Sequence, residues 1–378
     1  MSIGLSKVSE LKTLTIIVNY RSRDLTLDAV DSVLKSVSIG PVEIVVVDNS
    51  EDKDEAAILR SHLPAEVKLL VSPENLGFGR ACNLAFEQFQ GELILLINPD
   101  AKLLPGCLLR LQKTLCLGEK TAAVSPQVFW DEGLQFYLPP SYPPALLQWQ
   151  SFLVSWGPRH HTDRFMSSLW RNYALKIWRA RRPVKVNNLS GGLVLLRKEA
   201  IRSVGELFDT RFFLYLEDTD LFLRLRKAGY TLIIEPRARA VHHYDQCGRE
   251  EWERKRAIMA ESCRIFLAKH SNGWKSGIKR AMKRIRLKIQ ADDHHMPGPR
   301  FFSPFVLAVP PHCQDGWLFE WSPNHTLIPS AGRLGKGPRM DFNQKYWDML
   351  APGQYFGRLG NPALMGRYTH VVSWLVEK

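Results

Sequence analysis

Short apolar runs rich in β-branched residues alternate with stretches of helical spacing through the first third of the chain, and this alternation limits the fold most. The runs predicted to be strands are Leu14–Asn19, Glu43–Val47, Val67–Val71, Leu93–Ile97 and Ala122–Val128. The stretches predicted to be helices are 24–38, 51–62, 79–90 and 106–117. Because each strand is apolar on both faces, we expect an α/β fold in which helices flank a mostly parallel sheet.

The rest of the chain shows three further patterns. Residues 130–185 are rich in Pro, Trp and basic residues, which predicts an irregular insert over a site. Regular structure is expected to return with a strand over 186–196, a helix from about Thr219, a strand Thr231–Ile234 ending before Pro236, and a helix over about 250–270. The aromatic, Gly-rich C-terminal residues predict a small antiparallel β domain. Its tryptophans are expected to fill a core, and the alternatives are carbohydrate binding through exposed rings or burial in a subunit interface. The predicted domains are 1–270 (catalytic), 271–299 (a basic amphipathic helical linker) and 300–378 (a β-rich accessory domain).

The formal net charge of +13 implies an anionic partner, and nucleotide phosphates, nucleic acid or an acidic membrane surface would each suit it. Neither cluster of basic residues, 159–185 or 274–288, contains a recognisable nucleic-acid-binding motif, so we expect no nucleic-acid partner. Residues 274–288 place apolar side chains at helical intervals among lysines and arginines. Such a helix can lie on an anionic membrane, or it can pack its apolar stripe on the catalytic domain, and the sequence leaves both alternatives open.

The chain has no run of eighteen apolar residues and no signal-peptide pattern at its start, which predicts a cytoplasmic protein, with a peripheral position at the inner face of the plasma membrane if the basic helix binds there. The six cysteines are scattered without metal-finger spacing, so we expect free thiols. The oligomeric state cannot be inferred from this sequence.

Polar residues follow the predicted strands where ligands bind in parallel sheets, beyond the strands' carboxyl ends. Asn19 ends the first strand, Asp48 and Asn49 follow the second, and Asn98 and Asp100 follow the fourth. Carboxylates at such an edge suit a hard cation, Mg²⁺ or Mn²⁺, that keeps water and substrate phosphates in its shell. Each short motif alone would equally suit a turn or a helix cap.

The segment NLGFGRACN contains Asn75 and Gly77, and the glycine would let the backbone approach a ligand. A dinucleotide-binding fold needs its glycines after the first strand, where this chain has Asn19 and Tyr20. The pattern therefore counts against a dehydrogenase. A nucleotidyltransferase is also disfavoured, because a Gly-rich phosphate loop near the first strand is missing.

The segment FFLYLEDTDLFLRLRKAGY places Glu217, Asp218 and Asp220 at the start of a predicted helix. The helix dipole explains one or two acids there, but it does not require three. Paired carboxylates can deprotonate a sugar hydroxyl, one as the base and the other as its partner. His242, after a strand that contributes to the site, suits a metal or a diphosphate, although a lone His is more often structural.

Taken in order, VVVDNS, NLGFGRACN, LLINPD, LSGGLVLLRKEAIRSVG, FDTRFFLYLEDTDLFLRLRKAGY and VHH resemble the inverting family 2 glycosyltransferases, most closely the rhamnosyltransferase-like members, over about residues 13–270. The resemblance implies a GT-A fold, a nucleotide diphosphate sugar donor, which could be dTDP-rhamnose, and a divalent cation. It also implies transfer to a hydroxyl of a glycan or lipid-linked acceptor in cell-surface polysaccharide synthesis. The alternative is a non-catalytic sugar-nucleotide or glycan-binding protein.

The resemblance assigns roles residue by residue. Asp218 matches the family's base and Glu217 its partner, while Asp100 matches the last acid of the DxD metal motif and His242 a metal- or diphosphate-contacting position. Asn98 stands where many relatives have the first Asp of DxD, which weakens the expected metal site. The residues expected to contact the donor are Asn19, Asp48, Asn49, Asn75, Gly77, Asn98 and Gly191.

Overall fold

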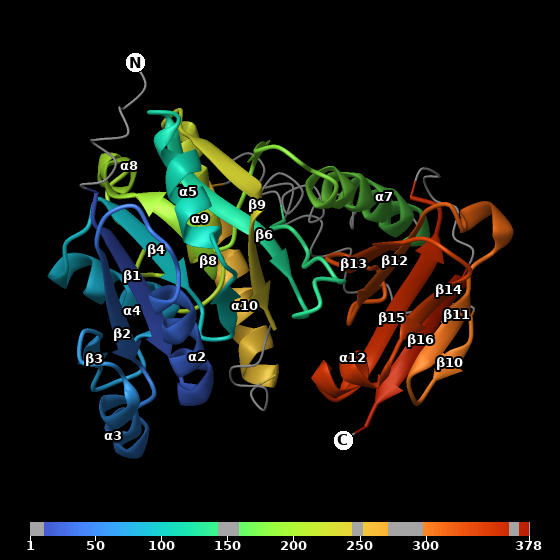
Figure 1. Ribbon diagram of the computed structural model, residues 1–378, viewed down its shortest axis with the longest axis horizontal. Helices are drawn as coiled ribbons and strands as arrows, with labels where there is room; N and C mark the ends of the chain where they lie inside the picture. The colour runs from blue at the N-terminus through green and yellow to red at the C-terminus, as the bar shows by residue number, and fades with distance from the viewer. Residues whose placement is uncertain (1–10, 143–158, 244–251, 271–297, 363–369, 378) are drawn as a thin grey trace. The chain divides into compact units, whose positions relative to one another are not determined.

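The computed structural model describes residues 11–142, 159–243, 252–270, 298–362 and 370–377 (Figure 1). The chain forms two compact units: Met1–Val128 with Ala180–His270, and Phe129–Arg179 with Ser271–Lys378. This division differs from the predicted domain bounds, because residues 129–179 are grouped with the C-terminal residues. The predicted basic helix at 274–288 lies outside the described residues.

The first unit is built on a nine-stranded sheet in the order β3-β2-β1-β4-β8-β6-β9-β5, with β7 paired to β9. Its strands are β1 (Thr13–Asn19), β2 (Val42–Asp48), β3 (Lys68–Val71), β4 (Leu93–Ile97), β5 (Ala101–Leu103), β6 (Thr121–Phe129), β7 (Val184–Val186), β8 (Leu193–Arg197) and β9 (Thr231–His242). β1 pairs in parallel with β2 and β4, and β2 with β3. The predicted α/β fold with a mostly parallel central sheet and flanking helices is confirmed.

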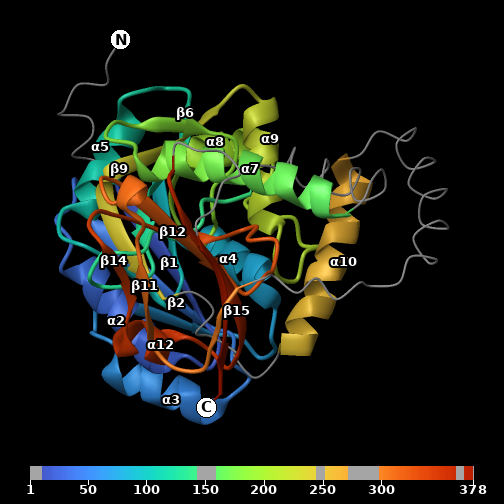
Figure 2. The ribbon, with the colours of Figure 1, turned by 90° about the vertical axis from the view of Figure 1, so that its right-hand side faces the viewer.

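The helices of this unit, apart from α10, contact strands of the sheet. They are α2 (Arg23–Leu34), α3 (Lys53–His62), α4 (Gly77–Gln88), α5 (Cys107–Cys116), α8 (Lys198–Ser203), α9 (Glu217–Lys227) and α10 (Trp252–His270). In α5, Leu108, Leu111 and Leu115 recur at helical spacing and are fully buried in the core that Val46 and Leu95 of the sheet also form. Figure 2 shows α10, drawn in gold, with its C-terminal end beside α9.

Strand β9 is longer than the sequence predicts, because it runs through Pro236 to His242. A proline has no backbone N–H for a ladder, which is why a strand end was expected there. Pro236 lies between the stretch that pairs with β7, at Leu232–Ile234, and the stretch that pairs with β5, at Ala240–His242. The proline therefore interrupts neither of these two ladders, and the strand delivers His242 to the end of the sheet.

The second unit contains a five-stranded sheet, β10-β16-β15-β12-β13, and a two-stranded sheet, β11-β14. Its elements are β10 (Arg300–Phe301), β11 (Phe305–Ala308), a 3-10 turn η1 (Pro311–Cys313), β12 (Trp317–Ser322), β13 (Ala331–Gly335), β14 (Arg339–Phe342), α12 (Gln344–Met349), β15 (Gly353–Gly360) and β16 (His370–Val376). The predicted small, mostly antiparallel β region is confirmed. Trp317, Trp321, Trp347 and Trp374 are all buried in its core, as expected.

Helix α7 (Arg159–Trp178) corrects the prediction of an irregular insert, because twenty residues of that region are helical. Its apolar residues Trp170, Ala174 and Trp178 are buried in a cluster with Leu318 and Ile328 of the second unit. Trp170 and Trp178, two of the tryptophans in this region, are therefore helical. Among the described residues, no helix is both long and apolar enough to cross a membrane.

We predict that Gly332→Ala destabilises the chain, because a Cβ at this position in β13 would lie 2.3 Å from the ring of Trp178. Trp178 is only 2% exposed and cannot move away without disturbing its neighbours. We expect a loss of about 1–3 kcal/mol, measured by urea unfolding. Gly316→Ala is the matched control, since nothing lies within 4 Å of a Cβ there, and equal stability of the two variants would contradict this packing.

Candidate active site

The first part of the candidate site lies where β1 and β2 end side by side. The parallel register sets Asn19 opposite Asp48, and Asn19 Nδ2 donates to Asp48 Oδ1 at 2.9 Å. Ser50 Oγ also donates to Asp48 Oδ1, at 2.7 Å. Asn19, Asp48 and Ser50 are all buried, so this predicted donor-binding acid is held in one orientation by its neighbours.

Asn19 itself makes many contacts with the protein. Its Oδ1 accepts from Ser22 and from Thr26 Oγ1, at 2.9 Å for the latter, and its Nδ2 also reaches Glu55 Oε1 at 3.2 Å. Asn19 is 0% exposed. Its geometry suits a residue that orients Asp48 and the start of α2, while the predicted contact with a donor stays a prediction.

The backbone is unusual at both strand ends. Arg21 has φ 49° and Glu51 has φ 56°, left-handed values that non-glycine residues adopt rarely and at some energetic cost. Arg21 N donates to Ser50 Oγ at 2.9 Å, which joins the two loops. Such strained turns cluster at functional sites because surrounding contacts must hold them in place.

Asn49 and Asn75, two of the residues expected to contact the donor, are hydrogen-bonded to each other. Asn49 Nδ2 donates to Asn75 Oδ1 at 2.8 Å, and Asn49 Oδ1 accepts from the backbone N–H of Leu76 at 2.8 Å. Asn75 Oδ1 also accepts from Gly77 N at 3.0 Å. The two amides therefore join the end of β2 to the start of α4.

Gly77 is needed for a close approach within the protein. Its φ of 76° is left-handed, and a Cβ would lie 2.1 Å from the carbonyl oxygen of Phe213. The next residue, Phe78, donates its N–H to that same oxygen at 3.0 Å. The absence of a side chain at Gly77 thus lets the loop before α9 pack closely against it. A ligand contact at Gly77 stays a prediction.

The predicted metal residues Asp100 and His242 lie together although they are far apart in the sequence. His242 Nε2 is 2.8 Å from Asp100 Oδ1. β5 pairs with the end of β9, with Ala101 opposite His242, and this pairing brings the two side chains into contact. Burial lowers the pKa of His242, but the Asp100 carboxylate more than offsets this effect and the net pKa is raised.

The predicted base, Asp218, lies against the two-glycine segment that leads into β8. Gly191 N donates to Asp218 Oδ2 at 2.8 Å, and Thr219 N donates to Asp218 Oδ1 at 2.6 Å. Burial raises the pKa of Asp218, and the hydrogen bonds from Gly191 and Thr219 oppose that rise without cancelling it. A partly buried carboxylate with a raised pKa is suited to accept a proton.

Asn98 approaches the other side of this two-glycine segment. Its backbone N–H donates to Gly192 O at 2.7 Å, and a Cβ on Gly192 would lie 2.8 Å from Asn98 Nδ2. Asp100 follows two residues later. The Gly191–Gly192 segment is therefore in contact both with the turn that carries Asp100 and with the carboxylate of Asp218.

Glu217 lies deeper than Asp218. Its side chain is 4% exposed, and its Oε2 has no hydrogen-bond partner among the described residues. Burial and the neighbouring Asp218 charge raise the pKa of Glu217 to about 8. At neutral pH this residue is therefore mostly a neutral acid, and not a second carboxylate.

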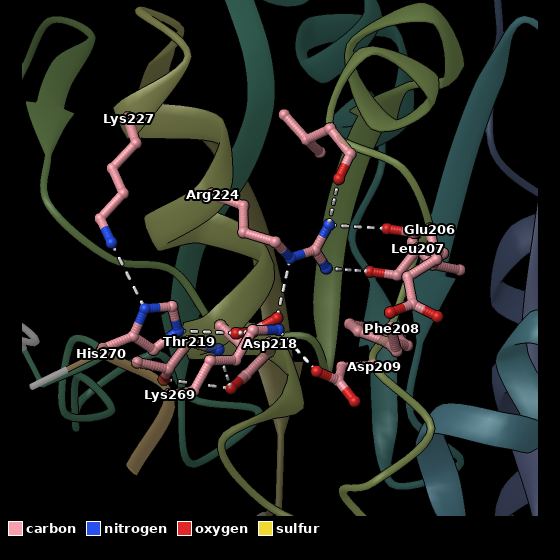
Figure 3. Close-up of polar contacts among 12 residues, drawn as sticks. Glu206, Leu207, Phe208, Asp209, Asp218, Thr219, Arg224, Lys227, Lys269 and His270 are labelled. Atoms are coloured by element: carbon pink, nitrogen blue, oxygen red, sulfur yellow. Dashed lines mark hydrogen bonds and ion pairs between the residues drawn. The ribbon is translucent and has the colours of Figure 1, made fainter. Parts of the chain in front are cut away.

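Asp220, the third acid of the motif, is paired with two cations and a histidine, and Figure 3 labels these three partners, Arg224, Lys269 and His270. Arg224 Nε, Lys269 Nζ and His270 Nε2 lie 2.8, 2.8 and 2.7 Å from its carboxylate. Sequence reasoning grouped it with the other two acids and missed its partners. Only the i to i+4 spacing to Arg224 could have shown one of them.

Thr219 and Asn188 also escaped sequence analysis. Thr219 holds Asp218 through its backbone N–H, and its hydroxyl accepts from Asn188 Nδ2 at 3.0 Å. These residues resemble ordinary helix and loop residues in the sequence. Their role depends on a contact between segments that only folding brings together.

A divalent cation fits the pair Asp100 and His242 by the chemistry of their donor atoms. A carboxylate oxygen and an imidazole nitrogen are both ligands that Mn²⁺ accepts. Within the described ranges, no group of three or more His, Cys, Asp or Glu side chains is placed to hold one metal ion. A cation bound by these two residues would complete its shell with substrate phosphate oxygens and water.

Comparison with known proteins shows which family the chain resembles. The model of Glycosyl transferase family 2 matches residues 15–205, about half of the chain. The N-acetylglucosaminyl-diphospho-decaprenol L-rhamnosyltransferase of Mycobacterium tuberculosis is 29% identical over 250 residues, which cover 62% of this chain and 77% of the relative. An uncharacterized protein, y4gI, of Sinorhizobium fredii is 22% identical over 243 residues, 60% of this chain and 24% of that protein.

Two solved structures show more distant similarity. The mannosyltransferase PcManGT from Pyrobaculum calidifontis, in complex with GDP-Man and Mn²⁺, has a TM-score of 0.41 and 16% identity, covering 75% of this chain and 76% of that one. GalNAc-T7 with UDP, GalNAc and Mn²⁺ has a TM-score of 0.43 and 16% identity, covering 62% of this chain and 44% of that one. The family match spans the strand ends that carry Asn19 and Asp48, the turn that carries Asp100, and the Gly191 segment against which Asp218 lies. The chain belongs to glycosyl transferase family 2 and is a glycosyltransferase.

Proposed function

We propose that this glycosyltransferase moves a deoxyhexose from a nucleoside diphosphate onto a hydroxyl of a lipid-linked glycan, with inversion at the anomeric carbon. The donor we favour is dTDP-rhamnose. The observation that carries the proposal is Asp218, held by Gly191 and Thr219 beside the turn of Asp100. The name of the mycobacterial relative, an L-rhamnosyltransferase acting on a decaprenol-linked sugar, supports the choice of donor and acceptor.

The chemistry is a single displacement. Asp218 accepts the proton of the acceptor hydroxyl as that oxygen attacks the anomeric carbon, and the bond from this carbon to the diphosphate breaks. The N–H groups of Gly191 and Thr219 keep the carboxylate pointing in one direction, which removes the need to order it during the reaction. Asp48 and Asn49 lie where the nucleoside would be bound, at the end of β2.

Asp100 and His242 would hold a divalent cation, Mg²⁺ or Mn²⁺. When bound, such a cation supplies positive charge for the departing diphosphate. Asn98 is uncharged where many members of the family have an acid. The proposed protein ligands of the cation are therefore one carboxylate, Asp100, and one imidazole, His242. Affinity for the free metal is therefore expected to be low, with most of the binding arising together with the donor.

A lipid-linked acceptor would place the enzyme at a membrane surface, and we include peripheral binding at the inner face of the plasma membrane in the proposal. The net charge of +13 supports attraction to anionic lipids. The proposed location depends on the proposed acceptor, because a water-soluble acceptor would not require a membrane.

We expect Asp218→Asn to lower kcat by about 10²- to 10⁴-fold, since the amide cannot accept the proton. Transfer from dTDP-rhamnose, UDP-N-acetylglucosamine and GDP-mannose to a lipid-linked acceptor is measured for the wild type and the variant. The variant should still be stabilised thermally by the donor that the wild type uses, because the amide leaves the donor-binding residues intact. Glu199→Gln, which changes an exposed acid on α8, is the control. Near-normal turnover of D218N would remove Asp218 from this role.

We expect Asp100→Asn and His242→Gln each to weaken Mn²⁺ binding by about tenfold or more when donor is present, because each removes a protein ligand. Binding is measured directly by the electron paramagnetic resonance signal of free Mn²⁺, with dTDP in place of the full donor. His62→Gln is the matched control for an exposed histidine. Unchanged Mn²⁺ affinity in both site variants would mean that the cation binds elsewhere or not at all.

We expect Glu217→Gln to make stability less dependent on pH. The pKa of Glu217 is about 8 in the folded chain, against 4.5 for an ordinary Glu. Between these values the folded chain keeps a proton that the unfolded chain has released, so stability falls as pH rises, by about 1.4 kcal/mol per unit. Urea unfolding from about pH 5 to 8 should show a shallower decline in E217Q, with kcat at neutral pH within about threefold of wild type. Parallel declines in the two proteins would show that Glu217 is ionised when folded.

A further inference from the structure

Asp220 is fully buried and lies two residues after the proposed base, in the first turn of α9. Its Oδ2 accepts from Arg224 Nε of the same helix at 2.8 Å. Its Oδ1 is 2.8 Å from Lys269 Nζ and 2.7 Å from His270 Nε2, both at the C-terminal end of α10. Figure 3 labels the three partners, Arg224, Lys269 and His270, beside α9. Burial raises the pKa of Asp220, but the hydrogen bonds from Lys269, Arg224 and His270 outweigh this effect and the net pKa is lowered.

The same end of α10 also holds the loop that precedes α9. Lys269 Nζ is 2.6 Å from Asp209 Oδ2, so one ammonium group joins the carboxylates of Asp209 and Asp220. Nearer the middle of α10, Ser262 Oγ donates to the carbonyl oxygen of Leu214 at 2.7 Å. The helix therefore contacts this loop at two places and α9 at a third.

The loop needs such support, because its last two residues have unfavourable backbone conformations. Tyr215 has φ 72° and Leu216 has φ 66°, both left-handed, immediately before Glu217 and Asp218. Non-glycine residues keep such values only where the surrounding structure holds them. Arg224 adds to that support by donating to the carbonyl oxygens of Glu206 and Leu207, at 2.8 and 2.9 Å.

We propose that Asp220, Lys269 and His270 form a clamp through which α10 positions the proposed base Asp218. The inference rests on the proposed function, since it assigns the clamp a purpose only if Asp218 is the base. The three clamp residues are positioning residues. The ion pairs fix the start of α9 and its strained turn, and thereby the direction of the Asp218 carboxylate toward Gly191. α10 is thus part of the catalytic machinery although it lies outside the central sheet.

The test removes the bridging ammonium group and keeps the length of the side chain. In Lys269→Met we expect kcat to fall by about tenfold or more while KM for the donor stays within about twofold, because the base and not the donor site is displaced. Lys269→Arg, which can still bridge two carboxylates, should restore most of kcat. The control is Glu261→Gln, which breaks the exposed Arg264–Glu261 pair on the same helix and should change neither constant.

Hydrogen–deuterium exchange provides a readout that does not need activity. Amides of residues 209–222 should exchange about tenfold faster in K269M, while those of β1 and β2 keep their wild-type rates. Should K269M fail to fold, His270→Gln is measured in the same way.

Wild-type kcat and wild-type exchange in K269M would overturn the clamp, and so would faster exchange spread evenly over the first unit. A wild-type enzyme that transfers no sugar from any donor would instead contradict the proposed function, while the exchange data would still decide whether α10 holds the start of α9.

Discussion

The parallel pairing of β1 with β2 on one side and β4 on the other is the constraint on which the site depends. Parallel strands end at the same edge, so Asn19 and Asp48 meet in register and the turn after β4 opens at the same edge. The antiparallel pairing of β4 with β8 then sets Leu193 opposite Ile97. That register brings the Gly191–Gly192 segment to the turn that carries Asp100. Strand ladders thus place Asn19, Asp48 and His242, and the segment that leads into β8 holds Asp218.

Three acids close together in one helical turn have three different electrostatic environments. Asp218 is partly exposed and held by N–H donors. Glu217 is buried, and one of its oxygens has no hydrogen-bond partner in the part of the chain that the structure describes. Asp220 is bound by Arg224, Lys269 and His270. The pKa values of Glu217 and Asp218 are raised and that of Asp220 is lowered. A single motif can therefore supply a base, a neutral acid and a structural anion, because burial and neighbouring charges differ over a few ångströms.

The second unit has a different kind of core. Aromatic rings fill it, and a buried carboxylate, Glu320, lies between Arg171 of α7 and Arg358 of β15 at 3.1 and 2.7 Å. Removing one partner of such a buried set is costly, because the remaining charges lose their compensation. This interaction explains why α7 stays with the C-terminal sheet although more than a hundred residues separate them in the sequence.

The sequence by itself determined the α/β class, the alternation of strands and helices in the first third of the chain, the β-rich C-terminal region and the family, because hydrophobic periodicity and the ordered series of motifs are local properties of the chain. The single strand expected over 186–196 is instead two strands, β7 and β8. The sequence also identified the residues that meet as Asn19 with Asp48, Asn49 with Asn75, and Asp100 with His242. Only the tertiary structure decided that α7 belongs to the second unit, that β9 continues through Pro236, and that Asp220 forms an ion pair with Lys269 of α10. These outcomes depend on partners distant in the sequence, and the free energy of burying a charge or a proline is set by those partners and not by the residues beside it.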